Sequence, residues 1–357
     1  MEELHIGNLK IKVPIIQGGM GIGVSMSGLA SAVANQGGVG VIAVAGLGMF
    51  EPDYARNFLE ANTRALRKEI QLARTMTDGV LGVNIMVALT NFGDLVKTSI
   101  EEGIDIIFAG AGLPLNLPQY LTEGAKTKLV PIVSSGRAAK ILCSKWKGLF
   151  DYLPDAIVVE GPKAGGHLGF KREQLDDPDF ALEKLIPEVV EQVKYFEEKY
   201  GIKIPVFAAG GIYTGGDIKN IMDLGASGVQ MGTRFVTTDE CDASMDFKQT
   251  YIDSKEEDMV IVNSPVGMPG RAIFNEFIAK AKRGEKRPIK CPYQCLRTCD
   301  IKTTPYCIVA VLVNAQKGNF YNGYAFAGSN AYKATKVISV KETIESLMRE
   351  YKEELQK

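Results

Sequence analysis

The sequence predicts an α/β fold in which eight parallel strands close into a TIM-type (β/α)8 barrel. Two observations carry this prediction. Short apolar runs, rich in β-branched residues and bounded by Gly or Pro, recur between residues 13 and 235. Such runs are typical of strands buried on both faces of a parallel sheet. Longer amphipathic segments separate them, and this alternation favours a closed barrel over an open sheet, which is the structural alternative.

The eight runs are spaced as successive barrel strands. They are Val13–Gln17, Gly38–Val44, Gly79–Val87, Ile104–Gly110, Lys128–Ser135, Ala156–Gly161, Pro205–Gly210 and Gly228–Phe235. The segments between them have helical periodicity. Ala181–Tyr200 carries its large apolar residues on one stripe, Ser27–Gln36 repeats small apolar residues at helical spacing, and Thr214–Leu224 begins with a capping threonine.

Beyond about residue 240 the alternation stops. We expect residues 1–240 to form the barrel, 241–310 an accessory lid segment over the strand C-termini, and 311–357 helices that pack back on the barrel. Within the last two parts the pattern predicts helices at Asp242–Met259, Ala272–Lys282, Tyr306–Gln316 and Lys341–Leu355, a Pro/Gly-rich loop at Val262–Ala272, and a basic segment at Arg283–Thr304.

Composition excludes several classes of function. The 357 residues have a formal net charge of −1, so no basic surface points to nucleic acid or anionic membranes. No uninterrupted run of about 18 apolar residues is present, and the first residues lack the pattern of a signal peptide. We therefore expect a cytoplasmic protein that acts on a small molecule, with no nucleic-acid or membrane partner. The sequence is compatible with a homodimer and does not determine the oligomeric state.

Glycine pairs follow the seventh and eighth predicted strands. Gly210 and Gly211 end the seventh, and Gly232 with Thr233 lies in the eighth. Barrels often hold a phosphate at these two loops, where glycine lets a ligand approach backbone N–H groups. Tight turns without a ligand are the alternative, but two such sites together favour phosphate binding.

His167 is the candidate catalytic residue. It follows the sixth predicted strand in the stretch EGPKAGGHLG, among glycines that would leave the imidazole open to a substrate. Strand C-termini form the active site of barrel enzymes, and histidine moves protons near neutral pH. A solvated loop histidine without a role is the alternative.

Four of the six cysteines fall within a short basic stretch. Cys291, Cys295, Cys299 and Cys307 have the spacing Cys-x3-Cys-x3-Cys-x7-Cys, and the first three would share one face if the segment were helical. Packed or reduced thiols are the first interpretation, a zinc or iron–sulfur site the second, and disulfides the third, because cytosolic proteins rarely keep them.

Several motifs together resemble the family of nitronate monooxygenases (2-nitropropane dioxygenase-like proteins) and flavin-dependent enoyl-ACP reductases. They are PIIQGGMG, GVNIM, EGPKAGGHLG, FAAGGI, GVQMGTRF, VGMPGRAIFN and AQKGNFYNGYAFAGSNA. The resemblance covers essentially the whole chain. It implies a barrel with a small lid and a non-covalently bound FMN.

The resemblance also implies roles for residues at the matching positions. His167 corresponds to the catalytic histidine. The residues implied to contact FMN are Gly18, Gly19 and Met20 beside the ring, Asn84, Glu160, Gly165 and Gly166 along the ring and ribityl chain, and Gly210, Gly211, Gln230, Met231, Gly232 and Thr233 around the phosphate. Two positions depart from the family. Lys163 replaces a glutamate before AGGH, and Glu160 stands where many nitronate monooxygenases carry glutamine.

These features predict an FMN-dependent oxidoreductase that oxidises alkyl nitronates with His167 as the base. The alternative within the same fold is an enoyl-ACP (enoyl-thioester) reductase that uses NAD(P)H, for which a glutamate at position 160 is more typical. A non-catalytic flavin-binding protein or an iron–sulfur electron-transfer protein is the alternative of another class.

Overall fold

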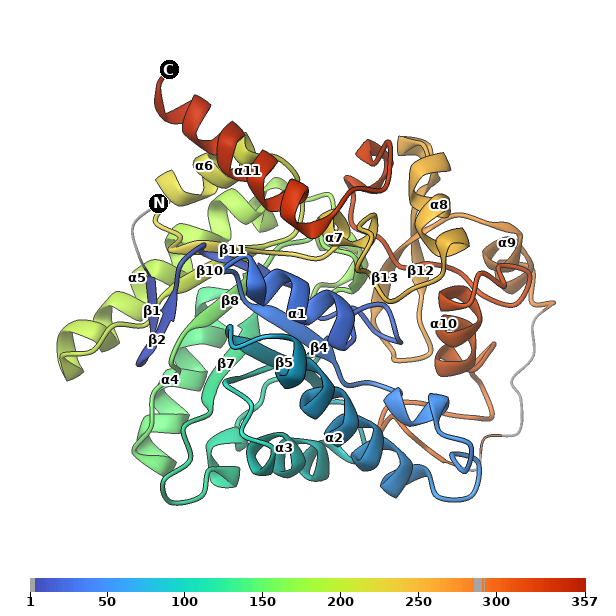
Figure 1. Ribbon diagram of the computed structural model, residues 1–357, viewed down its shortest axis with the longest axis horizontal. Helices are drawn as coiled ribbons and strands as arrows, with labels where there is room; N and C mark the ends of the chain where they lie inside the picture. Colours follow the sequence, from blue (N-terminus) through green and yellow to red (C-terminus); the bar gives the residue numbers. More distant parts are fainter. Residues whose placement is uncertain (1–3, 286–290, 292) are drawn as a thin grey trace.

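Eight parallel strands form one sheet that curls into a barrel (Figure 1). The computed structural model describes residues 4–285, 291 and 293–357. Each barrel strand falls within one of the eight predicted runs, so the predicted fold class is confirmed. The strands are β3 (Ile15–Gln17), β4 (Gly40–Ala43), β5 (Leu81–Met86), β6 (Ile106–Gly110), β7 (Lys128–Val133), β8 (Ile157–Glu160), β10 (Val206–Ala209) and β11 (Gly228–Met231).

The sheet closes between its first and last neighbours. Its order is β3-β11-β10-β8-β7-β6-β5-β4, and a parallel bridge between Ile16 of β3 and Val39 joins the two edges. Inward-facing apolar side chains, among them Phe108, Val158 and Phe207, fill the interior. The barrel is therefore a packed core, and a ligand can reach only its ends.

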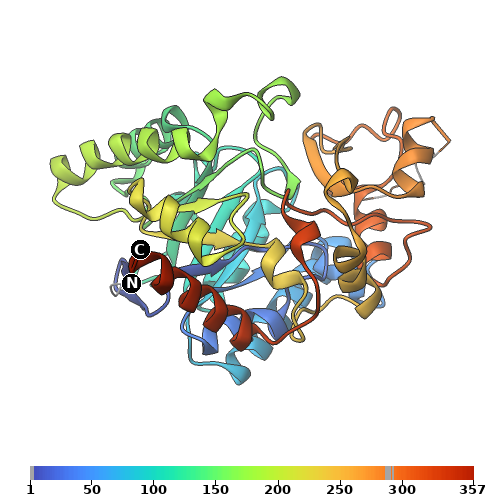
Figure 2. The same cartoon turned by 90° about the horizontal axis from the view of Figure 1, so that it is seen from above.

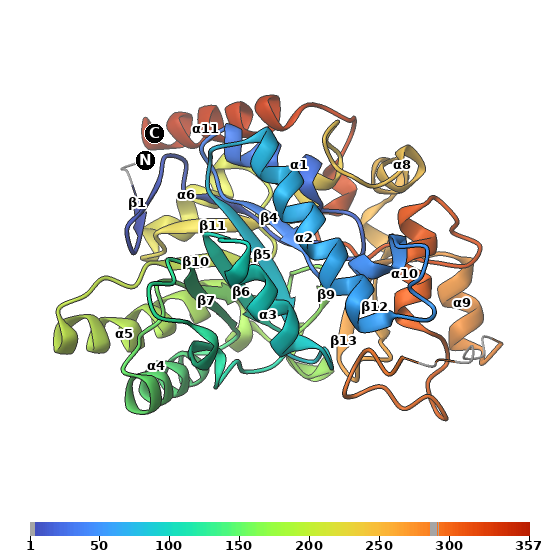
Figure 3. The same ribbon diagram turned by 60° about the horizontal axis from the view of Figure 1, so that its bottom comes forward.

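The two ends of the barrel are covered differently. An antiparallel hairpin, β1 (Leu4–Ile6) and β2 (Leu9–Ile11), buries Ile6 and Ile11 against the barrel interior at the strand N-termini. The accessory elements lie at the opposite end, as Figures 1 and 3 show. This leaves the strand C-termini facing the accessory region.

Helices surround the sheet because each buries one apolar stripe against it. In α5, for example, Leu185, Val189 and Val193 are buried. The last helix, α11, packs on α6 and α1 along the outside of the barrel. The surrounding helices are α1 (Ser27–Asn35), α2 (Phe58–Met76), α3 (Phe92–Glu101), α4 (Gly136–Phe150), α5 (Leu182–Tyr200), α6 (Gly215–Asp223), α7 (Thr233–Val236) and α11 (Val340–Leu355). Short 3-10 turns are η1 (Leu47–Phe50), η2 (Leu117–Tyr120), η3 (Arg172–Gln174), η4 (Pro178–Phe180), η5 (Glu256–Asp258) and η6 (Ala331–Lys333).

The accessory region is built on a β-hairpin that the sequence analysis missed. Its elements are α8 (Met245–Asp253), β12 (Met259–Asn263), β13 (Pro269–Ile273), α9 (Glu276–Lys282) and α10 (Ile308–Gln316). The prediction of a loop at Val262–Ala272 is therefore wrong, and so is the helix start at Ala272. The Pro and Gly residues form only the turn, where Gly267 has φ +85°, while β-branched residues on either side pair as strands. The predicted helix from Asp242 ends at Asp253, before β12 begins.

The hairpin reaches back to the barrel through a third strand. β9 (Gly166–His167) pairs antiparallel with β13, so that Gly270 lies opposite His167. From above, the accessory elements gather at one end of the barrel beside this sheet (Figure 2). The loop after β8 is thus held between the barrel and the accessory region.

The cysteine-bearing segment is irregular. From Cys295 to Asp300 it consists of a bridge and turns, so the arrangement expected for a helix at Cys291, Cys295 and Cys299 does not occur. Part of the predicted basic segment, residues 286–290 and 292, lies outside the described residues. Within the described part of the chain, every helix is too short or too polar to cross a bilayer.

Candidate functional site

A cavity of about 730 Å3 lies where the barrel strands end and the accessory region begins. Strand ends and the loops after them supply one side, and the accessory region supplies the other. Representative wall residues are Met20, Ala43, Asn84, Met86, Gly110, Ile132, Glu160, Gly210 and Gln230 from the barrel, and Val266, Met268, Ile308, Leu312 and Phe326 from the accessory side. This size is typical of a site for a cofactor or a small molecule.

The structure brings the predicted cofactor residues together around this cavity. They come from five separated motifs, yet each lines the same space: Gly18, Gly19, Met20, Asn84, Glu160, Gly165, Gly166, Gly210, Gly211, Gln230, Met231, Gly232 and Thr233. His167 lines it as well. Of the four clustered cysteines, only Cys295 reaches this wall.

Several of the glycines could not carry a side chain. A Cβ at Gly19 would lie 2.4 Å from the Asn84 Cβ, and one at Gly165 would lie 2.6 Å from the backbone nitrogen of Gly328. Gly210 and Gly211 have φ of +99° and +83°, in the region that favours glycine. The loops after β8 and β10 therefore present bare backbone to the cavity.

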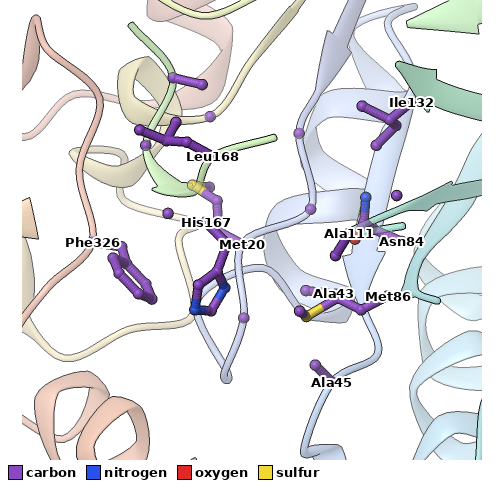
Figure 4. A pocket seen from close by; sticks show the side chains of 18 of the residues that line it. Met20, Ala43, Ala45, Asn84, Met86, Ala111, Ile132, His167, Leu168 and Phe326 are labelled. Atoms are coloured by element: carbon purple, nitrogen blue, oxygen red, sulfur yellow. The ribbon is translucent and has the colours of Figure 1, made fainter. Parts of the chain in front are cut away.

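His167 is fixed by two residues from the accessory region. Its Nε2 lies 2.6 Å from the Ser264 Oγ, and its ring packs edge-on against Phe326 with centroids 4.9 Å apart. Figure 4 shows the imidazole in the cavity beside Phe326 and Met20, across from Asn84 and Met86. Burial lowers the pKa of His167 to about 4, so the ring is neutral at pH 7. The histidine is therefore held on a short strand, in place of the open loop that its glycine neighbours predict.

Glu160 ends β8 and lines the same cavity. Burial raises the pKa of its carboxyl to about 8. The side chain is therefore neutral at pH 7 and can donate a hydrogen bond, as a glutamine in this position does. His167 and Glu160 are thus both uncharged near neutral pH, and Lys163 and Lys171 also line the cavity.

Contacts from the accessory region hold the glycine loops in place. Arg271 of β13 donates hydrogen bonds to the carbonyls of Pro162 (2.8 Å) and Ala164 (3.3 Å). The N–H of Gly328 donates to the Thr233 Oγ1 at 2.9 Å, and Asn330 donates to the Gly211 carbonyl at 2.6 Å.

Sequence reasoning missed Ser264, Phe326, Arg271 and Asn330 as site residues. The available signal was weak, because these residues lie in the C-terminal segments that resemble the family without an assigned role. Only the folded chain shows that each contacts the loops after the sixth, seventh or eighth barrel strand.

In chemical terms the site combines bare backbone, a neutral imidazole and a neutral carboxyl with an apolar wall. Bare N–H groups can bind an anion such as a phosphate. A neutral imidazole can accept a proton from carbon or donate a hydrogen bond to an oxyanion.

Comparisons with known proteins agree with this architecture. FabK from Thermotoga maritima superposes with a TM-score of 0.73 at 29% identity, covering 97% of this chain and 94% of that one. The nitroalkane oxidase from Streptomyces ansochromogenes gives a TM-score of 0.75 over 97% of both chains. At 21% identity the second likeness concerns the fold alone.

Sequence relatives point to one family. The probable nitronate monooxygenase of Staphylococcus saprophyticus is 30% identical over 312 residues, which are 77% of this chain and 79% of the relative. A Mycobacterium tuberculosis relative, named (3aS,4S,5R,7aS)-5-hydroxy-7a-methyl-1-oxo-octahydro-1H-indene-4-carboxyl-CoA dehydrogenase, is 29% identical over 77% of this chain and 67% of its own length. The sequence model described as nitronate monooxygenase matches residues 2–350. The chain therefore belongs to the nitronate monooxygenase family of oxidoreductases.

Proposed function

We propose that this protein is an FMN-dependent oxidoreductase that oxidises alkyl nitronates in the cavity at the barrel mouth. The observation that carries the proposal is the convergence of all the predicted FMN residues, from five separated motifs, on one cavity. The residues fit the group, since the positions proposed to border the phosphate, Gly210, Gly211 and Gly232, place no side chain in the cavity.

We assign the phosphate to the loops after β10 and β11 and the ring to the far side of the cavity. The first assignment follows the position at which barrel enzymes commonly bind phosphate. For the ring, Asn84 and the backbone of Gly18 and Gly19 supply polar groups at one edge. Once bound, FMN supplies the electron acceptor for the substrate.

His167 is the residue of the chain that we assign to the substrate. As a neutral imidazole it can accept the proton from the carbon next to a nitro group, or donate a hydrogen bond to a nitronate oxygen. Its contact with Ser264 determines which ring nitrogen remains free for this role. Leu168, Met86 and Ile132 offer an apolar wall to an alkyl chain and help to exclude water.

Reduction of an enoyl thioester with NAD(P)H is the second candidate. It is favoured by Glu160, whose neutral carboxyl can act as a hydrogen-bond donor in the cavity. Two relatives add support, since FabK shares the fold at 29% identity and the M. tuberculosis relative is named for an acyl-CoA substrate.

An anaerobic reduction experiment separates the two candidates. The purified protein is mixed with an alkyl nitronate, or with NADPH or NADH, while the flavin absorbance is followed. We expect the nitronate to bleach the flavin absorbance and NADPH and NADH to leave it unchanged. Rapid bleaching by a nicotinamide, with none by the nitronate, would identify the thioester reductase. His167→Ala should retain flavin and lose most turnover, and unchanged turnover would remove this histidine from the mechanism.

A further inference from the structure

Four thiols gather around a second, smaller cavity in the accessory region. This cavity has a volume of about 20 Å3 and is walled by Cys291, Gln294, Cys295, Leu296, Cys299, Ile301, Thr304, Cys307 and Ile308. All four cysteines are free and only partly exposed. The two remaining cysteines, Cys143 and Cys241, are buried elsewhere. The four cysteines thus converge around one space although the segment that carries them is irregular.

The arrangement differs from that of a single metal ion. Within residues 4–285, 291 and 293–357, no group of three Cys, His, Asp or Glu side chains is placed to hold one ion. Zinc bonds of about 2.3 Å bring four sulfurs to within about 4 Å of each other. Here the four cysteines instead surround a space larger than a single water molecule needs, roughly 10–15 Å3. Four cysteines around one space is the number of ligands that an iron–sulfur cluster uses.

The small cavity shares a wall with the proposed flavin cavity. Cys295, Leu296 and Ile308 line both spaces. A group bound by the cysteines is therefore separated from the larger cavity by single side chains.

Backbone contacts fix this wall against the barrel. Thr90 N–H donates to the Cys295 carbonyl at 3.1 Å, and Arg297 N–H donates to the Ala88 carbonyl at 3.0 Å. Both barrel residues follow β5, the strand that carries Asn84. On the other side, Thr298 donates to the Val266 carbonyl at 2.7 Å, in the turn of the β12–β13 hairpin.

We propose that Cys291, Cys295, Cys299 and Cys307 bind an iron–sulfur cluster in the wall of the proposed flavin cavity. Four cysteine thiolates are the usual ligand set of such clusters. A cluster here accepts one electron at a time from a low-potential one-electron carrier and passes it to the acceptor in the cavity. Two transfers, together with two protons from solvent, complete one two-electron reduction. The site rests on the cysteines alone. Electron input of this kind serves the thioester reductase, because a nitronate itself supplies the two electrons that reduce the acceptor.

Metal analysis of the whole protein tests the site directly. The chain is purified without oxygen, reconstituted with ferrous iron and sulfide, and assayed for iron, acid-labile sulfide and zinc. We expect about two or about four iron ions per chain with matching sulfide, and an electron paramagnetic resonance signal after reduction with dithionite. Stoichiometric zinc, disulfides between these cysteines, or a protein that remains free of iron after reconstitution would each overturn the proposal.

A pair of cysteine variants links the iron to this site. Cys299→Ala should lose most of the iron while keeping its flavin, which shows that the fold persists. Cys143→Ala removes an equally free thiol from α4 and should keep the full iron content. Equal iron content in the two variants would place the metal elsewhere.

Discussion

His167 and Glu160 are the two residues to which we assign the chemistry of the site, and burial keeps both neutral at pH 7. The order of the two pKa values is reversed, because the imidazole falls from 6.5 to about 4 and the carboxyl rises from 4.5 to about 8. Between these values the cavity contains neither charge. The negatively charged oxygen of a nitronate or an enolate can then lie beside these two groups without repulsion from a carboxylate.

The two groups should affect stability in opposite pH directions. The pKa of His167 is lowered from 6.5 to about 4. Its contribution to the free energy of unfolding is therefore fully present above pH 6.5 and is lost as the pH falls to about 4. The pKa of Glu160 is raised from 4.5 to about 8. Its contribution to the free energy of unfolding is therefore fully present below pH 4.5 and is lost as the pH rises to about 8. The difference in melting temperature between each variant and the flavin-free wild type should change with pH. For His167→Gln it should shift in favour of the variant as the pH falls from 6.5 to 4, and for Glu160→Gln as the pH rises from 4.5 to 8. Parallel curves for all three proteins would contradict these shifts.

Ser264 positions the imidazole. Ser264→Ala removes the 2.6 Å contact with Nε2 and frees the ring to rotate or change tautomer. We expect kcat to fall about tenfold, the equivalent of one hydrogen bond of about 1.4 kcal/mol, with flavin content unchanged. Ser346→Ala, in α11, is the matched control. Full activity of Ser264→Ala would show that the contact does not orient the histidine.

At the scale of elements, the β12–β13 hairpin supports the loop after β8, which carries His167. Its second strand, β13, pairs with β9 and so holds Gly166 and His167 in register. Arg271 adds hydrogen bonds to the carbonyls of Pro162 and Ala164. The loop after β8 consequently depends on residues about one hundred positions later in the chain.

Removing the Arg271 guanidinium should loosen this loop. Arg271→Met keeps the apolar length of the side chain and leaves two carbonyls without their donors. Stability should fall by about 1–3 kcal/mol, as expected when buried polar groups lose charged partners, and FMN should dissociate faster. Urea unfolding and flavin release measure the two effects. Arg283→Met, whose side chain is more than half exposed, should change neither, and a similar loss in both variants would count against a specific role for Arg271.

The barrel strands could be predicted, and the hairpin could not. Each barrel strand is buried on both faces, so its apolar run is visible in the sequence without knowledge of its neighbours. β12 and β13 are partly exposed, with a Pro/Gly-rich turn between them, and this pattern is equally typical of a loop. The pairing of β9 with β13 is a tertiary contact, which no local pattern encodes.

At the scale of the molecule, the location of the site follows from the topology. Parallel strands bring all their C-termini to one end of the barrel, so glycines and His167 from distant motifs meet there. Barrel topology does not determine the path of residues 241–357, because their sequence lacks the regular alternation of strands and helices. Ser264, Phe326 and the convergence of the cysteines around one cavity therefore required the structure.

Filling the proposed phosphate site should displace the flavin without unfolding the chain. Gly232 has φ −99°, so valine there introduces no left-handed strain, and its Cβ would lie 3.4 Å from the Met20 sulfur at the cavity wall. Gly232→Val should bind FMN at least tenfold more weakly, as measured by fluorescence titration. Gly148→Val, in α4 with open space around it, should bind FMN normally. Equal affinities would contradict the assignment of this loop.

The most direct test of the central claim is a comparison of FMN with riboflavin as ligands of the flavin-free protein. The two differ only in the phosphate that we assign to the loops after β10 and β11. Two charge-assisted hydrogen bonds from these loops, at about 1.5 kcal/mol each, correspond to an FMN preference of about 100-fold. A Kd for FMN lower than that for riboflavin by this factor is the predicted result. Equal Kd values, or no binding of either ligand, would contradict the account.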